Sequence, residues 1–218
     1  TIAAVAHRIA DKNRQAASVL AVLPSVKETV ARCSLLNVLG RIGDNSALPV
    51  LTAALKDENV DIKTAAIRAL ADWPTPEPTA ELLKIADSSG NKVHRILALR
   101  GFVRLLGLAS DRPAGDTIEM YKKAMNLAPD AGEKKKVLSG LSNTKSLAAL
   151  QMAAGYLDDE SLFVEAGAAA IHIAGGIYAN YPEQATDMLN RIIKTTKSDS
   201  LRQQAQEVLN NLEKAEEN

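Results

Sequence analysis

The sequence predicts an all-α fold of about six helical hairpins, and three observations support this. Of the 218 residues, 46% are hydrophobic but only 3% are aromatic, and Ala and Leu outnumber the aromatic and β-branched residues that strands prefer. Apolar residues recur at the spacing of one helix face, without the alternation typical of strands. The helical pattern also recurs along the chain, which is characteristic of a repeat protein.

The repeat is clearest in residues 59–70, where Ile62, Ala66, Ala69 and Leu70 share one face of the predicted helix. The same pattern ends at six anchor positions, which are Leu39, Leu70, Phe102, Leu141, Ile171 and Leu209. In five of the six units the residue seven before the anchor is basic, namely Arg32, Lys63, Arg95, Lys134 and Arg202.

A second set of helical segments lies between these anchor helices. Their ranges are residues 46–56, 79–86, 116–127, 146–157 and 182–194. Each repeating unit therefore pairs a first helix with an anchor-bearing second helix. The sequence predicts that the six pairs form a single repeat domain over residues 1–218.

Residues 59–70 resemble the second helix of a HEAT repeat, in particular the short lyase-type repeat of about 30 residues. The resemblance continues in Val93, His94, Arg95, Ala98, Leu99, Gly101 and Phe102. A tetratricopeptide repeat is the rival, because Tyr121, Ala124, Leu127 and Pro129 resemble its end, but that repeat keeps a period of about 34 residues. The anchors here are 30 to 39 residues apart. The HEAT resemblance implies a right-handed α-α superhelix, a HEAT/armadillo-like solenoid whose second helices line the inner face.

Charge and composition exclude several classes of protein. The 26 basic and 26 acidic residues balance, so we expect no nucleic-acid partner. No run of 18 apolar residues is present, so no membrane span is expected.

Cys33 is the only cysteine, and His7, His94 and His172 fall in different repeats without ligand spacing, so we expect neither a metal site nor a cofactor. His94 is predicted to lie at the surface, and His172 to be partly buried and to donate to a carbonyl.

Residues at matching positions of successive repeats indicate a candidate binding surface. One matching position holds Asn37, Arg68, Arg100, Ser139, Ala169 and Glu207, and the position one turn later holds Arg41, Asp72, Arg104, Asn143, Ile173 and Asn211. The candidate site is the arginine stripe, defined as Arg41, Arg68, Arg100 and Arg104. Guanidinium groups bind carboxylates and phosphates well, so this stripe suits an acidic peptide or an anionic ligand. The alternative is a solvated face that Asp61 and Asp72 partly neutralise.

These observations predict a non-catalytic module for protein–protein interaction or scaffolding, with a protein partner or an acidic peptide segment. Repeats create surface, and no nucleophile elbow, phosphate loop, dinucleotide fingerprint or EF-hand loop occurs in the sequence. The HEAT resemblance leaves two alternatives. A HEAT-like lyase or ligand-binding module would need a ligand-lined pocket, and a DNA-binding HEAT-like glycosylase would need a basic groove with aromatic residues.

The expected setting is a segment of a larger bacterial protein. The sequence starts at Thr1 almost directly in helical pattern, and the first unit lacks a clear polar capping helix. Similar helical arrays occur in extracytoplasmic bacterial proteins, and from this resemblance we expect a periplasmic or secreted setting.

Overall fold

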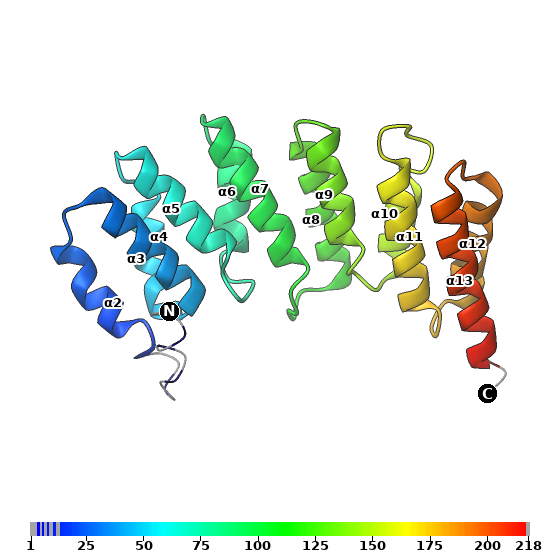
Figure 1. Ribbon diagram of the computed structural model, residues 1–218, viewed down its shortest axis with the longest axis horizontal. Coiled ribbons are helices and arrows are strands. Elements are labelled where there is room, and N and C mark those ends of the chain that lie inside the picture. Colours follow the sequence, from blue (N-terminus) through cyan, green and yellow to red (C-terminus); the bar gives the residue numbers. More distant parts are fainter. Residues whose placement is uncertain (1–3, 5, 7, 9–10, 12–13, 217–218) are drawn as a thin grey trace. The chain divides into compact units, whose positions relative to one another are not determined.

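The computed structural model describes residues 4, 6, 8, 11 and 14–216 (Figure 1). In this part of the chain the regular structure consists of α-helices and short 3-10 helices, with no strand. The predicted all-α fold class is confirmed. The chain divides into two compact units, Thr1–Ser110 and Asp111–Asn218.

The described residues of unit 1 form three helical hairpins. Their helices are α2 (Ala17–Val22) with α3 (Thr29–Ile42), α4 (Leu48–Ala54) with α5 (Val60–Ala71), and α6 (Thr79–Ser88) with α7 (Lys92–Leu106). Short 3-10 helices, η2 (Leu23–Ser25) and η3 (Asn45–Ala47), follow α2 and precede α4. All three second helices carry the predicted anchors Leu39, Leu70 and Phe102, which are buried.

Unit 2 contains three further hairpins. Their helices are α8 (Ala114–Leu127) with α9 (Ala131–Leu141), α10 (Leu147–Ala154) with α11 (Phe163–Ile177), and α12 (Pro182–Thr195) with α13 (Asp199–Glu216). The prediction of about six hairpins is therefore confirmed in the described part of the chain. The prediction of one domain spanning residues 1–218 stays a prediction.

Side-chain caps determine where the second helices of unit 1 begin. Asn59 Oδ1 accepts hydrogen bonds from the amides of Asp61 at 2.9 Å and Ile62 at 3.4 Å. Asn91 Oδ1 does the same for Val93 at 2.9 Å and His94 at 3.3 Å. Each cap satisfies amides that have no partner within the helix. The same cap thus starts α5 and α7, eleven residues before their anchors.

Two predicted first helices are shorter than expected. The segment 46–56 begins as the 3-10 helix η3 and continues as α4, which ends at Ala54. The segment 146–157 forms α10, which ends at Ala154. In both cases the last predicted residues form turns instead, because the chain must reverse into the next helix within a few residues.

The second helices of unit 1 form one layer centred on α5. Helix α5 packs directly against α3 and α7, and the three lie side by side in Figure 1. Successive first helices, such as α4 and α6, make little contact with each other. Because the second helices approach one another more closely than the first helices do, their layer is the inner side of the stack in unit 1.

Two glycines allow this close packing. A Cβ atom placed on Gly40 of α3 would lie 2.5 Å from Ala69 Cα, and one placed on Gly101 of α7 would lie 2.4 Å from Ala71 Cβ and 2.8 Å from its Cα. Real Cβ atoms essentially never come so near to backbone atoms. Glycine at both positions therefore lets α3 and α7 lie against the last turn of α5.

A buried carboxylate connects the first two hairpins of unit 1. Asp44 is only 4% exposed, and its oxygens accept hydrogen bonds from the amides of Ala16 and Ser46, both at 2.9 Å. Burial by itself raises the pKa of Asp44, but these amides and the Ser46 hydroxyl favour the charged form and bring the pKa below its ordinary value. The carboxylate thus holds the start of α2 against the start of α4.

Replacing Gly101 with Ala should lower the free energy of unfolding by about 1–3 kcal/mol, because α7 must shift away from the Ala71 backbone. Gly90→Ala is the matched control, since an added Cβ at that position meets nothing within 4 Å and should change stability by less than about 0.5 kcal/mol. Denaturant unfolding of both variants measures this. Equal stability of the two variants would contradict the close packing of α5 and α7.

Asp44→Ala should lower the free energy of unfolding by about 1–3 kcal/mol at pH 7, because the buried amide of Ala16 loses its acceptor. The pKa of Asp44 is lower in the folded chain than in the unfolded chain. Its charge therefore stabilises the fold above the unfolded pKa, and this contribution disappears as the pH falls through the folded pKa. The cost of the substitution should shrink in acid, as measured by urea unfolding between pH 3 and pH 7.

The control for this experiment is Asp87→Ala, which removes an exposed carboxylate of α6. This substitution should change the free energy of unfolding by less than about 0.5 kcal/mol. A cost for Asp44→Ala that does not vary with pH would show that the charge of Asp44 contributes nothing.

Candidate functional site

The arginine stripe lies on the three second helices of unit 1, and all four side chains are exposed. Arg41, Arg68 and Arg104 occupy the last turns of α3, α5 and α7. Cations are favoured there because the carbonyl end of a helix carries partial negative charge. Since α3, α5 and α7 pack in succession, the structure brings the stripe together on one layer of unit 1.

Arg104 differs from the other members of the stripe. Its Nε donates to the carbonyl of Ala71 at 2.7 Å, and its terminal NH2 group donates to the carbonyl of Trp73. Burial lowers the pKa of this guanidinium, and the nearby carboxylate of Asp72 partly offsets the effect. The side chain of Arg104 therefore holds the C-terminal end of α5. Arg41, Arg68 and Arg100 are the other exposed members of the stripe.

The repeat register predicted for α11 is wrong by one residue. Ala169 and Ile173, which were expected at the inner-face positions, are buried at 2% and 0% exposure. Ala168 and His172 are exposed instead. The anchor helix of this unit is so rich in small apolar residues that two adjacent registers fit the sequence pattern, and only packing against α9 and α13 distinguishes them.

His172 makes a contact between hairpins that resembles the contact of Arg104. Its Nδ1 donates to the carbonyl of Ser142, the C-cap residue of α9, at 2.9 Å. The predicted bond to a carbonyl is confirmed, whereas the side chain is exposed rather than partly buried. In both units, a polar side chain late in one second helix thus binds carbonyls at the end of the preceding second helix.

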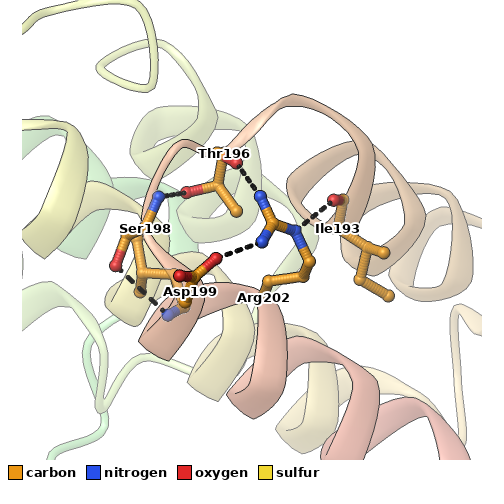
Figure 2. Close-up of polar contacts among 6 residues, drawn as sticks. Ile193, Thr196, Ser198, Asp199 and Arg202 are labelled. Carbon is orange, nitrogen blue, oxygen red and sulfur yellow. Dashed lines mark hydrogen bonds and ion pairs between the residues drawn. The ribbon is translucent and has the colours of Figure 1, made fainter.

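The basic position seven residues before the anchor also acts at helix ends. Arg32 pairs with Asp57 at 3.3 Å, in the turn between α4 and α5. Figure 2 shows Arg202 in the last hairpin, where it donates to the carbonyls of Thr196 at 2.7 Å and Ile193 at 3.4 Å and pairs with Asp199. At these two of the five basic positions, the residue therefore stabilises a turn between helices, a role that its sequence position did not reveal.

The prediction for His94 is wrong. The side chain is 6% exposed and not on the surface, because its position, eight residues before the anchor, faces the core, as the equivalent Ile62 of α5 does. Its Nε2 lies 2.9 Å from Thr64 Oγ1. Burial lowers the pKa of His94, and the charge of Lys63 lowers it further. His7 lies outside the described residues.

A family model described as HEAT repeats matches residues 10–102. Over this segment the sequence is similar to HEAT repeats. The resemblance seen in residues 59–70 and 93–102 is thereby confirmed, and the matched segment includes Arg41, Arg68 and Arg100 and ends two residues before Arg104. No curated protein matches this sequence. HEAT repeats in general mediate protein–protein interaction or scaffolding.

Two further observations concern the described residues only. Within residues 4, 6, 8, 11 and 14–216, no group of three or more His, Cys, Asp or Glu side chains is placed to hold a metal ion. Among the helices of the same residues, none combines the length and apolar character that a membrane span requires.

Replacing Arg104 with Met should lower the free energy of unfolding by about 1 kcal/mol, because the carbonyls of Ala71 and Trp73 lose a charged donor while the apolar stem is largely kept. Arg41→Met is the matched control on α3 and should change stability by less than about 0.5 kcal/mol. Thermal and denaturant unfolding measure both. Equal small effects would show that Arg104 is as free to bind a partner as Arg41.

Proposed function

We propose that this chain is a non-catalytic protein-interaction module, and that a partner's acidic segment binds the inner layer of unit 1 through Arg41, Arg68 and Arg100. The observation that supports this most is the succession of exposed arginines on α3, α5 and α7, three second helices that pack in order. A partner segment lying across these helices would meet one arginine after another.

The chemistry of the layer favours a carboxylate-rich segment. Guanidinium groups bind carboxylates through two parallel hydrogen bonds, which gives both strength and orientation. Salt screens exposed charges beyond about 8 Å at physiological ionic strength. Binding that depends on several exposed arginines should therefore weaken as salt is added.

Arg104 has a separate part in this proposal. Because its guanidinium donates to Ala71 and Trp73, it acts as a positioning residue that fixes the end of α5. Arg68 lies in the last turn of that helix. The bond from α7 to α5 therefore fixes the relative placement of Arg68 and Arg100.

The test is the binding of a fluorescently labelled peptide of alternating Asp and Glu, measured by anisotropy with the full chain. The double variant Arg68→Glu/Arg100→Glu should weaken binding about tenfold or more, because two attractive pairs become repulsive. The same peptide with Asn and Gln in place of Asp and Glu should bind at least about tenfold more weakly to the unsubstituted chain.

The matched control is Arg95→Glu, which reverses an exposed charge near the start of α7, away from Arg100. It should leave binding within about twofold, because a single exposed charge at a distance is mostly screened. Unchanged binding by the double variant, with its helical circular dichroism retained, would overturn the proposal. An equal loss of peptide binding in Arg95→Glu would show that the effect depends only on net charge, and this would likewise contradict the proposal.

A further inference from the structure

Clefts recur between successive hairpins, at the edge where each first helix turns into its second helix. The first cleft, of about 610 Å³, lies between hairpins α2/α3 and α4/α5. The second cleft, of about 460 Å³, lies between hairpins α4/α5 and α6/α7. Equivalent residues line the two clefts, so differences between them reflect substitutions at matching positions.

The first cleft contains its own counter-ion. Arg32 of α3 pairs with Asp57 across the cleft at 3.3 Å. Asp57 Oδ1 also accepts a hydrogen bond from the amide of Asn59 at 2.9 Å, in the turn that precedes α5. Asp57 therefore both shapes this turn and neutralises the cation of the preceding hairpin.

The second cleft keeps the cation and lacks the counter-ion. Lys63 takes the position of Arg32, seven residues before the anchor, and Ser89 takes the position of Asp57, two residues before the Asn cap. Ser89 Oγ still accepts a hydrogen bond from the amide of Asn91, at 3.3 Å. The shape of the turn is thus retained, but the negative charge opposite Lys63 is gone.

Other charges increase this imbalance. Lys56 and Lys84 also line the second cleft, and Glu81 is the only acidic residue among its lining residues. In the described part of the chain, none of the three lysines forms an ion pair. The second cleft therefore has a net positive charge that no contact within these residues compensates.

His94 adds a polar group to the same cleft at a position where α5 has the buried Ile62. Thr64 Oγ1 donates its only hydrogen to the carbonyl of Val60 at 2.7 Å, so it must accept from Nε2 of His94 at 2.9 Å. The proton of neutral His94 is therefore on Nε2. No hydrogen bond to Nδ1 of His94 occurs within the described residues.

We propose that the second cleft binds a phosphate group through Lys56, Lys63 and Lys84, with His94 as an additional donor once its imidazole is protonated. The amides at the start of α7 lie beside the cleft at Asn91 and contribute positive potential. A dianion of this size would replace the carboxylate that Asp57 supplies in the first cleft. The group can belong to free phosphate or to a phosphorylated side chain, which share this chemistry.

Protonation of His94 couples to the proposed binding. The charged residues that line the cleft together with His94 are Lys63 of α5, Glu81 and Lys84 of α6, and Lys56, which follows α4. Helices α5 and α6, which pack against α7, also carry Asp61, Arg68 and Asp87 outside this lining. In the empty cleft, burial and Lys63 hold the pKa of His94 below its ordinary value. A bound anion favours the charged imidazolium, so binding should raise the pKa of His94 and should strengthen as the pH falls.

The test is an NMR titration of the full chain with inorganic phosphate at constant ionic strength, following the imidazole resonances. The resonances of His94 should shift and its pKa should rise, while those of His172, which belongs to unit 2, should not respond. Sodium chloride at the same ionic strength should produce no such shift. Response of both histidines alike, or of neither, would overturn the proposal.

Ser89→Asp is the decisive variant, because it restores the counter-ion of the first cleft while an Asp in this position can still accept from the amide of Asn91, as Asp57 does for Asn59. It should weaken phosphate binding about tenfold or more. Ser139→Asp, an exposed change of equal charge on α9, should leave binding within about twofold. If Ser89→Asp does not fold, Lys84→Gln should still weaken binding severalfold.

A second set of titrations identifies the source of the phosphate group. A short neutral peptide with one phosphoserine is compared with inorganic phosphate and with the unphosphorylated peptide. Tighter binding of the phosphopeptide assigns the cleft to a phosphorylated side chain, and tighter binding of inorganic phosphate assigns it to a free anion. Phosphate binding that both Ser89→Asp and Lys84→Gln leave unchanged would overturn the proposal for either source.

Discussion

The close approach of three helix backbones at α5 is the constraint on which unit 1 depends. Gly40 and Gly101 place α3 and α7 against Ala69 and Ala71 with no room for a side chain between them. This contact makes the second helices a tight layer and the first helices a looser one. The close packing of α3, α5 and α7, the helices that carry Arg41, Arg68 and Arg100, depends on those two glycines.

Polar bonds between hairpins then fix the register of neighbouring repeats. Arg104 binds the carbonyls that end α5 and His172 binds the carbonyl that ends α9, whereas Arg202 acts within its own hairpin, on the carbonyls that end α12. Each bond satisfies acceptors that have no partner within their own helix. A repeat protein of this kind therefore uses many of its cations to hold neighbouring hairpins together, and only the remaining cations are available to a partner.

The comparison of equivalent positions separates structural charges from surplus charges. At the turn between the two helices of a hairpin, Asp57 lies opposite Arg32 of the preceding hairpin, whereas Ser89 takes this position opposite Lys63. Ser89 in place of Asp57, together with Lys56 and Lys84, makes the second cleft the more positive of the two, while the hydrogen bond that shapes the turn is kept. Because the repeats share one backbone arrangement, each hairpin serves as an internal reference for the next.

Much of the fold could be predicted from the sequence, since helical periodicity and the caps Asn59 and Asn91 are local signals. The candidate arginines could also be placed on one layer, because equivalent positions must align. The role of Arg104 and the burial of His94 could not be predicted, because each depends on how far the next hairpin lies from its neighbour. The same is true of Gly40 and Gly101, whose importance depends on the position of the α5 backbone.

Hydrogen exchange of backbone amides in the intact chain tests the central claim most directly, namely that unit 1 is organised around α5. The account predicts that the amides of α5 are the slowest to exchange in unit 1, that α3 and α7 follow, and that α4 and α6 exchange faster. Exchange of α5 as fast as that of α4 would contradict it, because the helix at the centre of the layer would then open independently of its neighbours.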